Sequence, residues 1–136
     1  KHMVGLLYLD LDRFKGVNDS FGHAVGDLLL RETAARLTES LRLSDTAARM
    51  GGDEFTVILT KITETADAAI VARRIVDNLS KPFFLENHEV SIGVSIGIGI
   101  YPIDGEDADV LLKKADTAMY RAKGTGSNLF RYFHKG

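Results

Sequence analysis

The chain has 136 residues, enough for one domain with a buried core, and its hydrophobic share of 45% and charged share of 26% are typical of globular proteins. Its 17 basic and 19 acidic side chains give a net charge of -2, which argues against a general nucleic-acid or anionic-membrane binder, so we expect no nucleic-acid partner. The absence of cysteine excludes a disulfide scaffold, thiolate metal sites and thiol catalysis.

The first residues carry no recognisable targeting signal. Lys1, His2 and Met3 are interpreted as a cloning remnant, and the apolar run at residues 4–9 is too short for a signal peptide. No apolar run approaches the roughly 18 residues that cross a bilayer. We therefore expect a cytoplasmic domain without direct membrane insertion, and the sequence leaves open whether the parent protein is anchored.

The first third of the chain predicts a strand, a loop and a helix. Residues 4–12 form a nearly continuous apolar run, typical of a central strand covered on both faces. Asp10 and Asp12 end this strand two residues apart, so they share a face. Residues 13–26 are rich in Gly, Asn, Asp and Ser and predict a loop. A helix over residues 27–41 follows, with apolar positions at helical spacing: Leu30, Ala34, Leu37 and Leu41.

The middle of the chain predicts a hairpin and a second helix. Two short β-rich segments, residues 46–50 and 55–59, flank the turn Gly51-Gly52-Asp53. This pattern predicts a hairpin whose acidic tip is exposed and whose glycines accept positive φ angles. Residues 66–79 have one apolar face and predict a helix, which Pro82 prevents from continuing.

The last third predicts a long strand, a helix and a final short strand. Apolar residues alternate over residues 88–101, which indicates a strand. Residues 108–123 predict a helix that Gly124 ends, and residues 129–133 predict the last strand. The order β-α-β-β-α-β-α-β predicts an α+β fold, a mixed α/β sandwich in one domain over residues 4–136.

Four carboxylates form the main chemical hypothesis. Asp10 and Asp12 end a buried strand, and Asp53 and Glu54 lie at the hairpin turn. If the hairpin lies beside the first strand, the acidic tips meet and repel one another, so they favour a cation. Oxygen ligands without cysteine favour Mg²⁺ or Mn²⁺. Any single Asp here is more simply a solvated cap, and the metal is preferred only for the four together.

Three segments resemble a known family. They are residues 10–27, DLDRFKGVNDSFGHAVGD; residues 51–55, GGDEF; and residues 115–123, ADTAMYRAK. Together they resemble the opening, naming and C-terminal signatures of GGDEF domains, in order and over almost the whole chain. A five-residue match alone is weak support, but three linked motifs are strong support.

The resemblance implies a fold and a reaction. The fold is like the palm of nucleotide cyclases and polymerases, with a ferredoxin-like core and a mainly antiparallel sheet flanked by helices. The reaction is that of a diguanylate cyclase, which condenses two GTP into cyclic di-GMP and two pyrophosphates. By this resemblance the metal contacts are Asp10, the carbonyl of Leu11, and Asp53. Asp53 is also the base for the 3′-hydroxyl, and Glu54 is a supporting carboxylate.

The resemblance also implies which residues contact GTP. These are Phe14, Lys15, Asn18, His23, Asp27 and Lys123. Asn18 and Asp27 resemble the guanine-reading pair, Phe14 and Lys15 the phosphate contacts, and Lys123 the lysine at the terminal phosphates. Lys15 is counted with Asp53 and Glu54 as catalytic, because phosphoryl chemistry depends on charge neutralisation. For His23 the sequence leaves open a substrate contact or an ordinary helix-start histidine.

A product-inhibition site is a further implication. Arg42-Leu43-Ser44-Asp45 precedes the GGDEF motif by the spacing of the family's RxxD site, which holds a cyclic di-GMP dimer. Arginine suits this role because it pairs with phosphate in a bidentate manner and stacks on bases. Arg73, on the next predicted helix, resembles a secondary contact. The simpler alternative for this tetrad is a surface ion pair.

Two departures from the family pattern bear on function. Ser127 stands where an arginine is usual, so we expect a lower GTP affinity or rate. The family's usual preceding segment and helix are not among the residues of this chain, which leaves open weaker dimer geometry or a trimmed chain. The main hypothesis is a cyclase that works as a transient homodimer downstream of a sensor. Residues 95–102 and 118–120 further resemble GGDEF domains that precede an EAL phosphodiesterase domain. The alternatives are a weakly active GTP-binding regulatory module or a cyclic di-GMP receptor without turnover.

Overall fold

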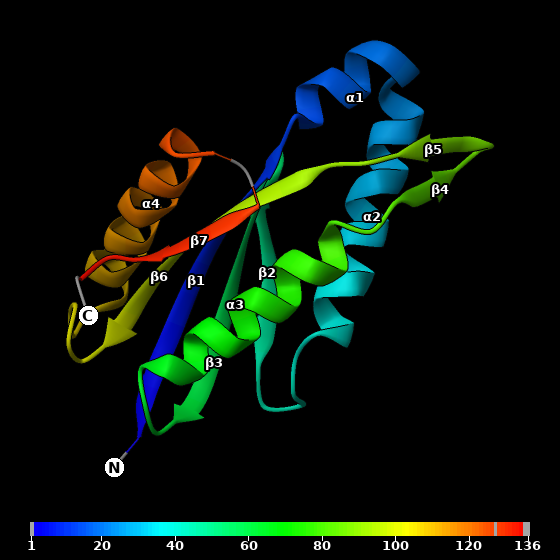
Figure 1. The fold of residues 1–136 in the computed structure, drawn as a ribbon. Coiled ribbons are helices and arrows are strands. Elements are labelled where there is room, and N and C mark those ends of the chain that lie inside the picture. The colour runs from blue at the N-terminus through cyan, green and yellow to red at the C-terminus, as the bar shows by residue number, and fades with distance from the viewer. Residues whose placement is uncertain (1, 127, 135–136) are drawn as a thin grey trace.

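A five-stranded sheet forms the centre of the computed structural model, which describes residues 2–126 and 128–134 (Figure 1). Its strands are β1 (Met3–Asp12), β2 (Thr46–Gly51), β3 (Glu54–Ile62), β6 (Gly93–Tyr101) and β7 (Leu129–Tyr132). Their order across the sheet is β2-β3-β1-β6-β7, and only the β6–β7 pair is parallel. The helices are α1 (Phe14–Phe21), α2 (His23–Glu39), α3 (Ala66–Leu79) and α4 (Ala108–Gly124).

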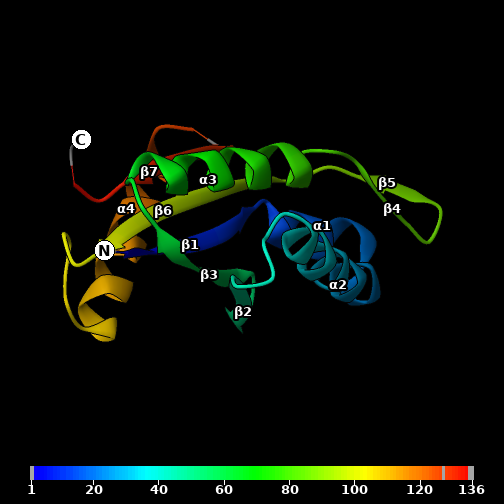
Figure 2. The same cartoon turned by 90° about the horizontal axis from the view of Figure 1, so that it is seen from below.

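The connection β1-α2-β2-β3-α3-β6, with the spatial order β2-β3-β1-β6, is a ferredoxin-like core to which α4 and β7 are added. The expected α+β class and mainly antiparallel sheet are confirmed. Figure 2 shows the sheet between α3 on one side and α4 on the other. In the described part of the chain, no helix combines the length and apolar character needed to cross a membrane.

The two faces of β1 have different environments, because successive strand residues point to opposite faces. Leu7, Leu9 and Leu11 are buried in the main core, which α2 and α3 cover. Leu6 and Tyr8 pack in a smaller cluster with α4. The alternation therefore carries Asp10 and Asp12, at the end of the strand, onto the α4 face.

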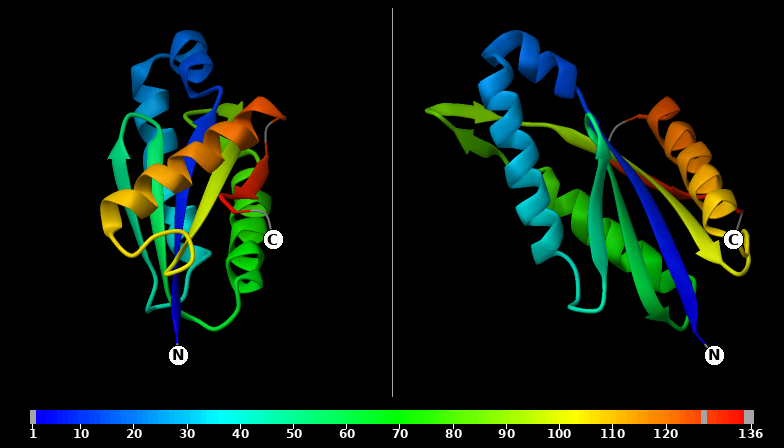
Figure 3. Two further views of the ribbon diagram at one scale, coloured as in Figure 1. Left: turned by 90° about the vertical axis from the view of Figure 1, so that its left-hand side faces the viewer. Right: turned by 180° about the vertical axis from the view of Figure 1, so that it is seen from behind.

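Helix α4 lies unusually close to the sheet at Gly97 of β6. A Cβ atom at Gly97 would lie 2.0 Å from the Ala115 carbonyl oxygen and 2.2 Å from the Met119 nitrogen. Both are backbone atoms of α4, so no side-chain rotation would relieve the clash. The left view of Figure 3 shows α4 crossing this face of the sheet. The absence of a side chain at Gly97 thus fixes how near the residues of α4 come to β1.

The predicted loop at residues 13–26 is wrong, because the segment contains α1 and the start of α2. Arg13 (φ 66°) and Gly22 (φ 92°) bound the short helix α1. Val17 is buried in the core, so one face of α1 is packed despite its polar composition. Tertiary burial stabilises a helix here that local propensity disfavours.

The predicted long strand at residues 88–101 is also divided. Its first part is β5 (His88–Val90), which pairs with β4 (Phe83–Leu85) in a separate two-stranded sheet. Glu86 and Asn87, with φ of 47° and 68°, form the turn between them. Figure 1 shows this hairpin extending beside α2, away from the main sheet. By contrast, α3 has the predicted bounds, and β7 ends one residue earlier than expected.

Arg36 connects α2 to the last turn of α3 and to the residues that follow it. Its guanidinium donates to the carbonyls of Asn78, Lys81 and Pro82 at 3.0, 2.7 and 2.8 Å. The same group lies 3.5 Å from the centre of the Phe83 ring. A planar fork can satisfy three carbonyls and stack on a ring at once, which a lysine ammonium cannot do.

Arg36→Lys should therefore lower the free energy of unfolding by about 1–3 kcal/mol, because at least one carbonyl loses its charged donor. Urea denaturation of the purified chain measures this. Arg31→Lys, on an exposed position of the same helix, is the matched control and should change stability by less than about 0.5 kcal/mol. Equal stability of the two variants would contradict the bridging role of Arg36.

Candidate functional site

The hairpin turn between β2 and β3 is held against the end of β1. Gly51 and Gly52 have φ angles of 150° and 51°, as the Gly-Gly sequence predicts. The Arg49 Nε donates to the Gly52 carbonyl at 2.9 Å, and the Leu11 N–H donates to the Asp53 carbonyl at 3.1 Å. The Leu11 side chain is buried in the core, so only its backbone is available to the site.

Two buried carboxylates lie at the end of β1. Asp10 and Asp12 are each only 7% exposed. Lys123 of α4 places its Nζ 2.5 Å from Asp10 Oδ2 and 3.8 Å from Asp12 Oδ1, and the Ser95 hydroxyl donates to Asp12 at 3.0 Å. Burial alone would lower the pKa of Lys123, but the hydrogen bond and charge of Asp10 raise it above its ordinary value. The lysine therefore stays protonated over this pair.

Asp53 from the hairpin comes close to Asp10. Burial and the charge of Asp10 raise the pKa of Asp53, and the charge of Lys123 opposes that rise. Within the described residues, Asp10 Oδ1 is buried and has no hydrogen-bond partner. A buried, unpaired carboxylate oxygen beside a second carboxylate suits a hard divalent cation, and only oxygen donors surround it. The residues thus fit the expected Mg²⁺ or Mn²⁺.

Two of the four carboxylates considered from the sequence accept hydrogen bonds from protein hydroxyl groups in the structure. Glu54 accepts a hydrogen bond from the Tyr8 hydroxyl at 2.8 Å, and Asp12 is bonded to Ser95. In residues 2–126 and 128–134, no group of three His, Cys, Asp or Glu side chains is arranged to hold an ion. Asp10 and Asp53 remain as the candidate pair, because Asp10 Oδ1 has no partner among the described residues although Asp10 Oδ2 binds Lys123, and Asp53 lies near Asp10.

Asp116 of α4 is a further acidic residue at this place. Burial, followed by the charges of Glu54 and Asp10, raises the pKa of Asp116. Burial and the hydrogen bond to Glu54 likewise raise the pKa of Tyr8. Asp116 lies two helical turns before Lys123, so both project from one side of α4 toward β1. The site therefore contains an acidic group in addition to the four carboxylates considered from the sequence.

The substrate-binding candidates of residues 14–27 lie on the corner formed by α1 and α2. Phe14 is partly buried against the core, and Lys15 is exposed in the first turn of α1. Asn18 is half-buried, whereas Asp27 is exposed on α2. His23 is the exposed first residue of α2, which is the helix-start position of the simpler alternative. The corner brings the Asn18 side chain against the turn of α2 that carries Asp27.

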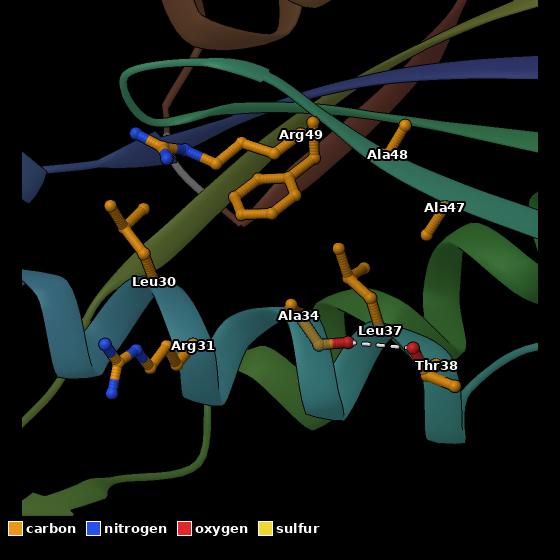
Figure 4. Close-up of a pocket in the computed structure, with 9 residues that line it drawn as sticks. Leu30, Arg31, Ala34, Leu37, Thr38, Ala47, Ala48 and Arg49 are labelled. Carbon is orange, nitrogen blue, oxygen red and sulfur yellow. Dashed lines mark hydrogen bonds between the residues drawn. The ribbon is translucent and has the colours of Figure 1, made fainter.

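A groove of about 240 Å³ runs between α2 and β2 from the turn after Asp27 (Figure 4). Figure 4 shows the side chains of Arg31 and Arg49 extending in the same direction from opposite walls. The walls and floor are otherwise largely apolar and include Leu30, Ala34, Leu37 and Phe55. Ala34, expected on the buried face of the helix, is exposed in this groove.

The RxxD tetrad forms a closed ion pair away from the acidic hairpin. Arg42 binds Asp45 through Nε and Nη2, both at 3.0 Å, and its Nη2 donates to the Thr60 carbonyl at 2.7 Å. Burial disfavours the charged form of Asp45, but the hydrogen bonds from Arg42 hold its pKa below the ordinary value. Arg74 lines the same 350 Å³ cavity as Arg42. Arg73 instead lies 5.1 Å from the Phe130 ring centre.

Comparison with known proteins identifies the family. The family model described as "Diguanylate cyclase, GGDEF domain" matches residues 1–129. The chain belongs to the GGDEF domain family.

Relatives of this GGDEF domain support the assignment. It is 49% identical over 128 residues to the bifunctional diguanylate cyclase/cyclic di-GMP phosphodiesterase MucR of Pseudomonas aeruginosa, and it is 42% identical over 124 residues to the diguanylate cyclase TpbB of the same species. The matches cover 94% and 90% of this chain but only 18% of MucR and 28% of TpbB. The chain thus spans less than a third of these relatives.

Solved structures agree with the fold. The GGDEF domain of TpbB superposes with a TM-score of 0.95 at 39% identity, covering 99% of this chain and 84% of that one. The GGDEF domain of DgcB from Caulobacter crescentus, solved in complex with c-di-GMP, gives a TM-score of 0.90 at 29% identity. That match covers 98% of this GGDEF domain and 80% of the DgcB chain.

Sequence reasoning missed several residues of this GGDEF domain. Tyr8 is two positions before Asp10, and Asp116 is seven before Lys123, so strand and helix periods were signals that could have found them. Arg74 could not be separated from its neighbour Arg73 without knowing which way α3 faces. Ser127, the expected departure from the family pattern, lies outside the described residues.

Asp53→Asn should raise the melting temperature of the GGDEF domain at neutral pH without divalent cations. Because the folded pKa of Asp53 is raised, its stabilising contribution is present at low pH and is lost as pH rises through that pKa. Adding Mg²⁺ should stabilise the parent chain, by about 2.7 kcal/mol at 100 times the dissociation constant, but not the variant. Thermal melts in EDTA and Mg²⁺ measure both effects. Asp77→Asn, exposed on α3, is the control. An identical Mg²⁺ response in all three proteins would contradict a cation at Asp53.

Proposed function

We propose that this GGDEF domain is a diguanylate cyclase, which condenses two GTP into cyclic di-GMP and two pyrophosphates. The observation that supports this best is Asp10 Oδ1, which is buried, has no hydrogen-bond partner among the described residues and lies near the Asp53 carboxylate. Nucleotidyl transfer depends on positioning and on neutralising phosphate charge, and this arrangement combines acidic ligands with a protonated lysine.

Asp10, the Leu11 carbonyl and Asp53 would hold Mg²⁺ or Mn²⁺ in this function. The cation, when bound, supplies positive charge to the triphosphate. Lys123 and Lys15 add positive charge at the phosphates, and the backbone at Phe14 supplies N–H donors. Asp53 acts as the general base and takes the proton of the 3′-hydroxyl. Glu54 supports it as a second carboxylate.

Guanine is read by Asn18 and Asp27 in this proposal. The Asp27 carboxylate accepts from the N–H groups of the guanine Watson–Crick edge, a pattern that adenine does not present. The Asn18 amide supplies both donor and acceptor. His23, exposed at the start of α2, is left with two roles, a substrate contact or a helix-start residue. The apolar groove beside Asp27 offers a surface along which a bound nucleotide can lie.

Two copies of the domain complete one reaction. The product is two-fold symmetric, so two GTP-loaded protomers facing each other across a two-fold axis match it. We expect this homodimer to be transient. The bifunctional name of MucR is consistent with a parent protein in which sensor or EAL domains accompany this one.

A weakly active regulatory module is the second candidate function. One observation favours it: Lys123 donates directly to Asp10, the carboxylate that the cation would need. Such a module would bind GTP or cyclic di-GMP and act on an attached phosphodiesterase domain. Product formation separates the two functions, because only the cyclase consumes GTP.

Incubation with GTP and Mg²⁺, followed by chromatography, should yield cyclic di-GMP. Asp53→Asn should reduce product formation by at least about 100-fold, the usual contribution of a general base, while the variant stays folded because Asp53 lies at a turn. Asp77→Asn is the matched control and should keep full activity. Absence of product from the parent chain would favour the regulatory module, and full activity of Asp53→Asn would remove Asp53 from the mechanism.

Product feedback at Arg42 and Asp45 is the second part of the proposal. Cyclic di-GMP held there by charge-assisted contacts would bridge two domains and keep their active sites apart. The complex of DgcB with c-di-GMP is consistent with a GGDEF domain that binds this product. Arg42 and Arg74 both line a cavity of about 350 Å³, which offers a place for part of the ligand.

Arg42→Ala should abolish inhibition by cyclic di-GMP and leave GTP binding nearly unchanged. Because this variant leaves the buried Asp45 unpaired and lowers stability, Arg74→Ala is the second variant, and it should weaken inhibition more than Arg73→Ala does. Calorimetric titration with cyclic di-GMP and inhibition curves measure the effects. If Arg42→Ala and Arg74→Ala bind cyclic di-GMP as the parent chain does, the tetrad is only an ion pair. If Arg73→Ala loses more inhibition than Arg74→Ala, Arg73 is the secondary contact of the product site.

A further inference from the structure

The Asn18 side chain lies directly on the backbone of α2 at Gly26. A Cβ atom placed on Gly26 would lie 1.8 Å from Asn18 Oδ1, 2.9 Å from Cγ and 3.5 Å from Nδ2. No pair of non-bonded atoms tolerates the first of these distances. Gly26 itself is buried, and its φ angle is ordinary for a helix, so turn geometry does not explain the glycine. Space for the Asn18 carboxamide does explain it.

Packing, rather than hydrogen bonding, holds this carboxamide. The hydrogen bonds found in residues 2–126 and 128–134 include none to the Asn18 side chain. The backbone around it is fixed, because the Gly22 N–H donates to the Asn18 carbonyl at 2.8 Å and the Gly26 N–H donates to the Gly22 carbonyl at 3.2 Å. The amide therefore rests against α2 with its donor and acceptor capacity unused. The Asn18 carboxamide can therefore form hydrogen bonds with a ligand.

The geometry points to Gly26 as a specificity-determining position: the missing side chain seats the Asn18 carboxamide beside Asp27, so that the two polar groups face one base. This inference rests on the proposed function, in which Asn18 and Asp27 read guanine. Gly26 touches no reacting atom and acts through Asn18, so it is a positioning residue.

The kind of atom that an added Cβ would meet determines whether the Gly26→Ala variant folds. At Gly97 an added Cβ would meet α4 backbone atoms, whereas at Gly26 it would meet the end of a short side chain. The chain can relieve the second clash by rotating Asn18 out of place. Gly26→Ala should therefore remain folded, since alanine also favours the helix. In this variant, however, the Asn18 carboxamide should no longer keep its orientation.

The test compares the affinities for 3′-deoxy-GTP and 3′-deoxy-ATP, which lack the hydroxyl that condenses and so form no product during calorimetry. Gly26→Ala should lower the GTP-over-ATP affinity ratio by roughly tenfold or more, the effect of losing one base-edge pair. Gly16→Ala is the matched control, because nothing lies within 4 Å of a Cβ at that position of α1. It should keep the ratio of the parent chain.

Asn18→Ala and its combination with Gly26→Ala complete the design. The double variant should melt no lower than Asn18→Ala and show no further loss of selectivity, because the obstacle is gone. Loss of selectivity in Asn18→Ala but not in Gly26→Ala would overturn this inference alone. Unchanged selectivity in both would also remove Asn18 from the proposed function. If Gly26→Ala fails to fold, folding of the double variant supports the contact, and failure of both to fold overturns it.

Discussion

The burial of two carboxylates at the end of β1 is the constraint on which the site depends. Asp10 and Asp12 are covered, and an uncompensated buried charge would cost several kcal/mol. Lys123 provides the compensation, and it reaches Asp10 because α4 lies directly on the sheet at Gly97. A contact in the middle of α4 thus sets the position of a charge at its end. Among the described residues, no group pairs with Asp10 Oδ1, so this carboxylate is only partly compensated.

The proposed substrate site and the proposed product site are held in place by different hydrogen bonds. The acidic hairpin is tied to β1 through the backbone of Leu11 and to β2 through Arg49. The Arg42–Asp45 pair is instead tied to β3 through Thr60. Substrate and product sites therefore share the sheet but no side chain. This separation allows product to be bound without displacing the groups that would hold GTP.

Local pattern predicted the regular elements of this GGDEF domain where burial follows a simple period. The helix Ala66–Leu79 is one example, because it buries one face against the core. Strand β6 is another: its alternating apolar side chains lie in the main core, and its Gly97 lies under α4. The pattern failed at residues 13–26, where packing of Val17 outweighs a loop-like composition. It also failed before β6, since nothing local indicates that β5 leaves the long strand to pair with β4.

The sequence by itself determined the family, the fold class and the chemical groups available, because the spacing of the motifs and the alternation of apolar residues in β6 are local properties of the chain. Only the tertiary structure decided which of those groups contact one another. In the structure, Glu54 accepts a hydrogen bond from Tyr8, Asp12 accepts one from Ser95, and Arg74 lines the same cavity as Arg42. The physical reason is that these partners come from elements distant in the chain. Their pairing follows from strand register and helix rotation, which packing of the whole core fixes.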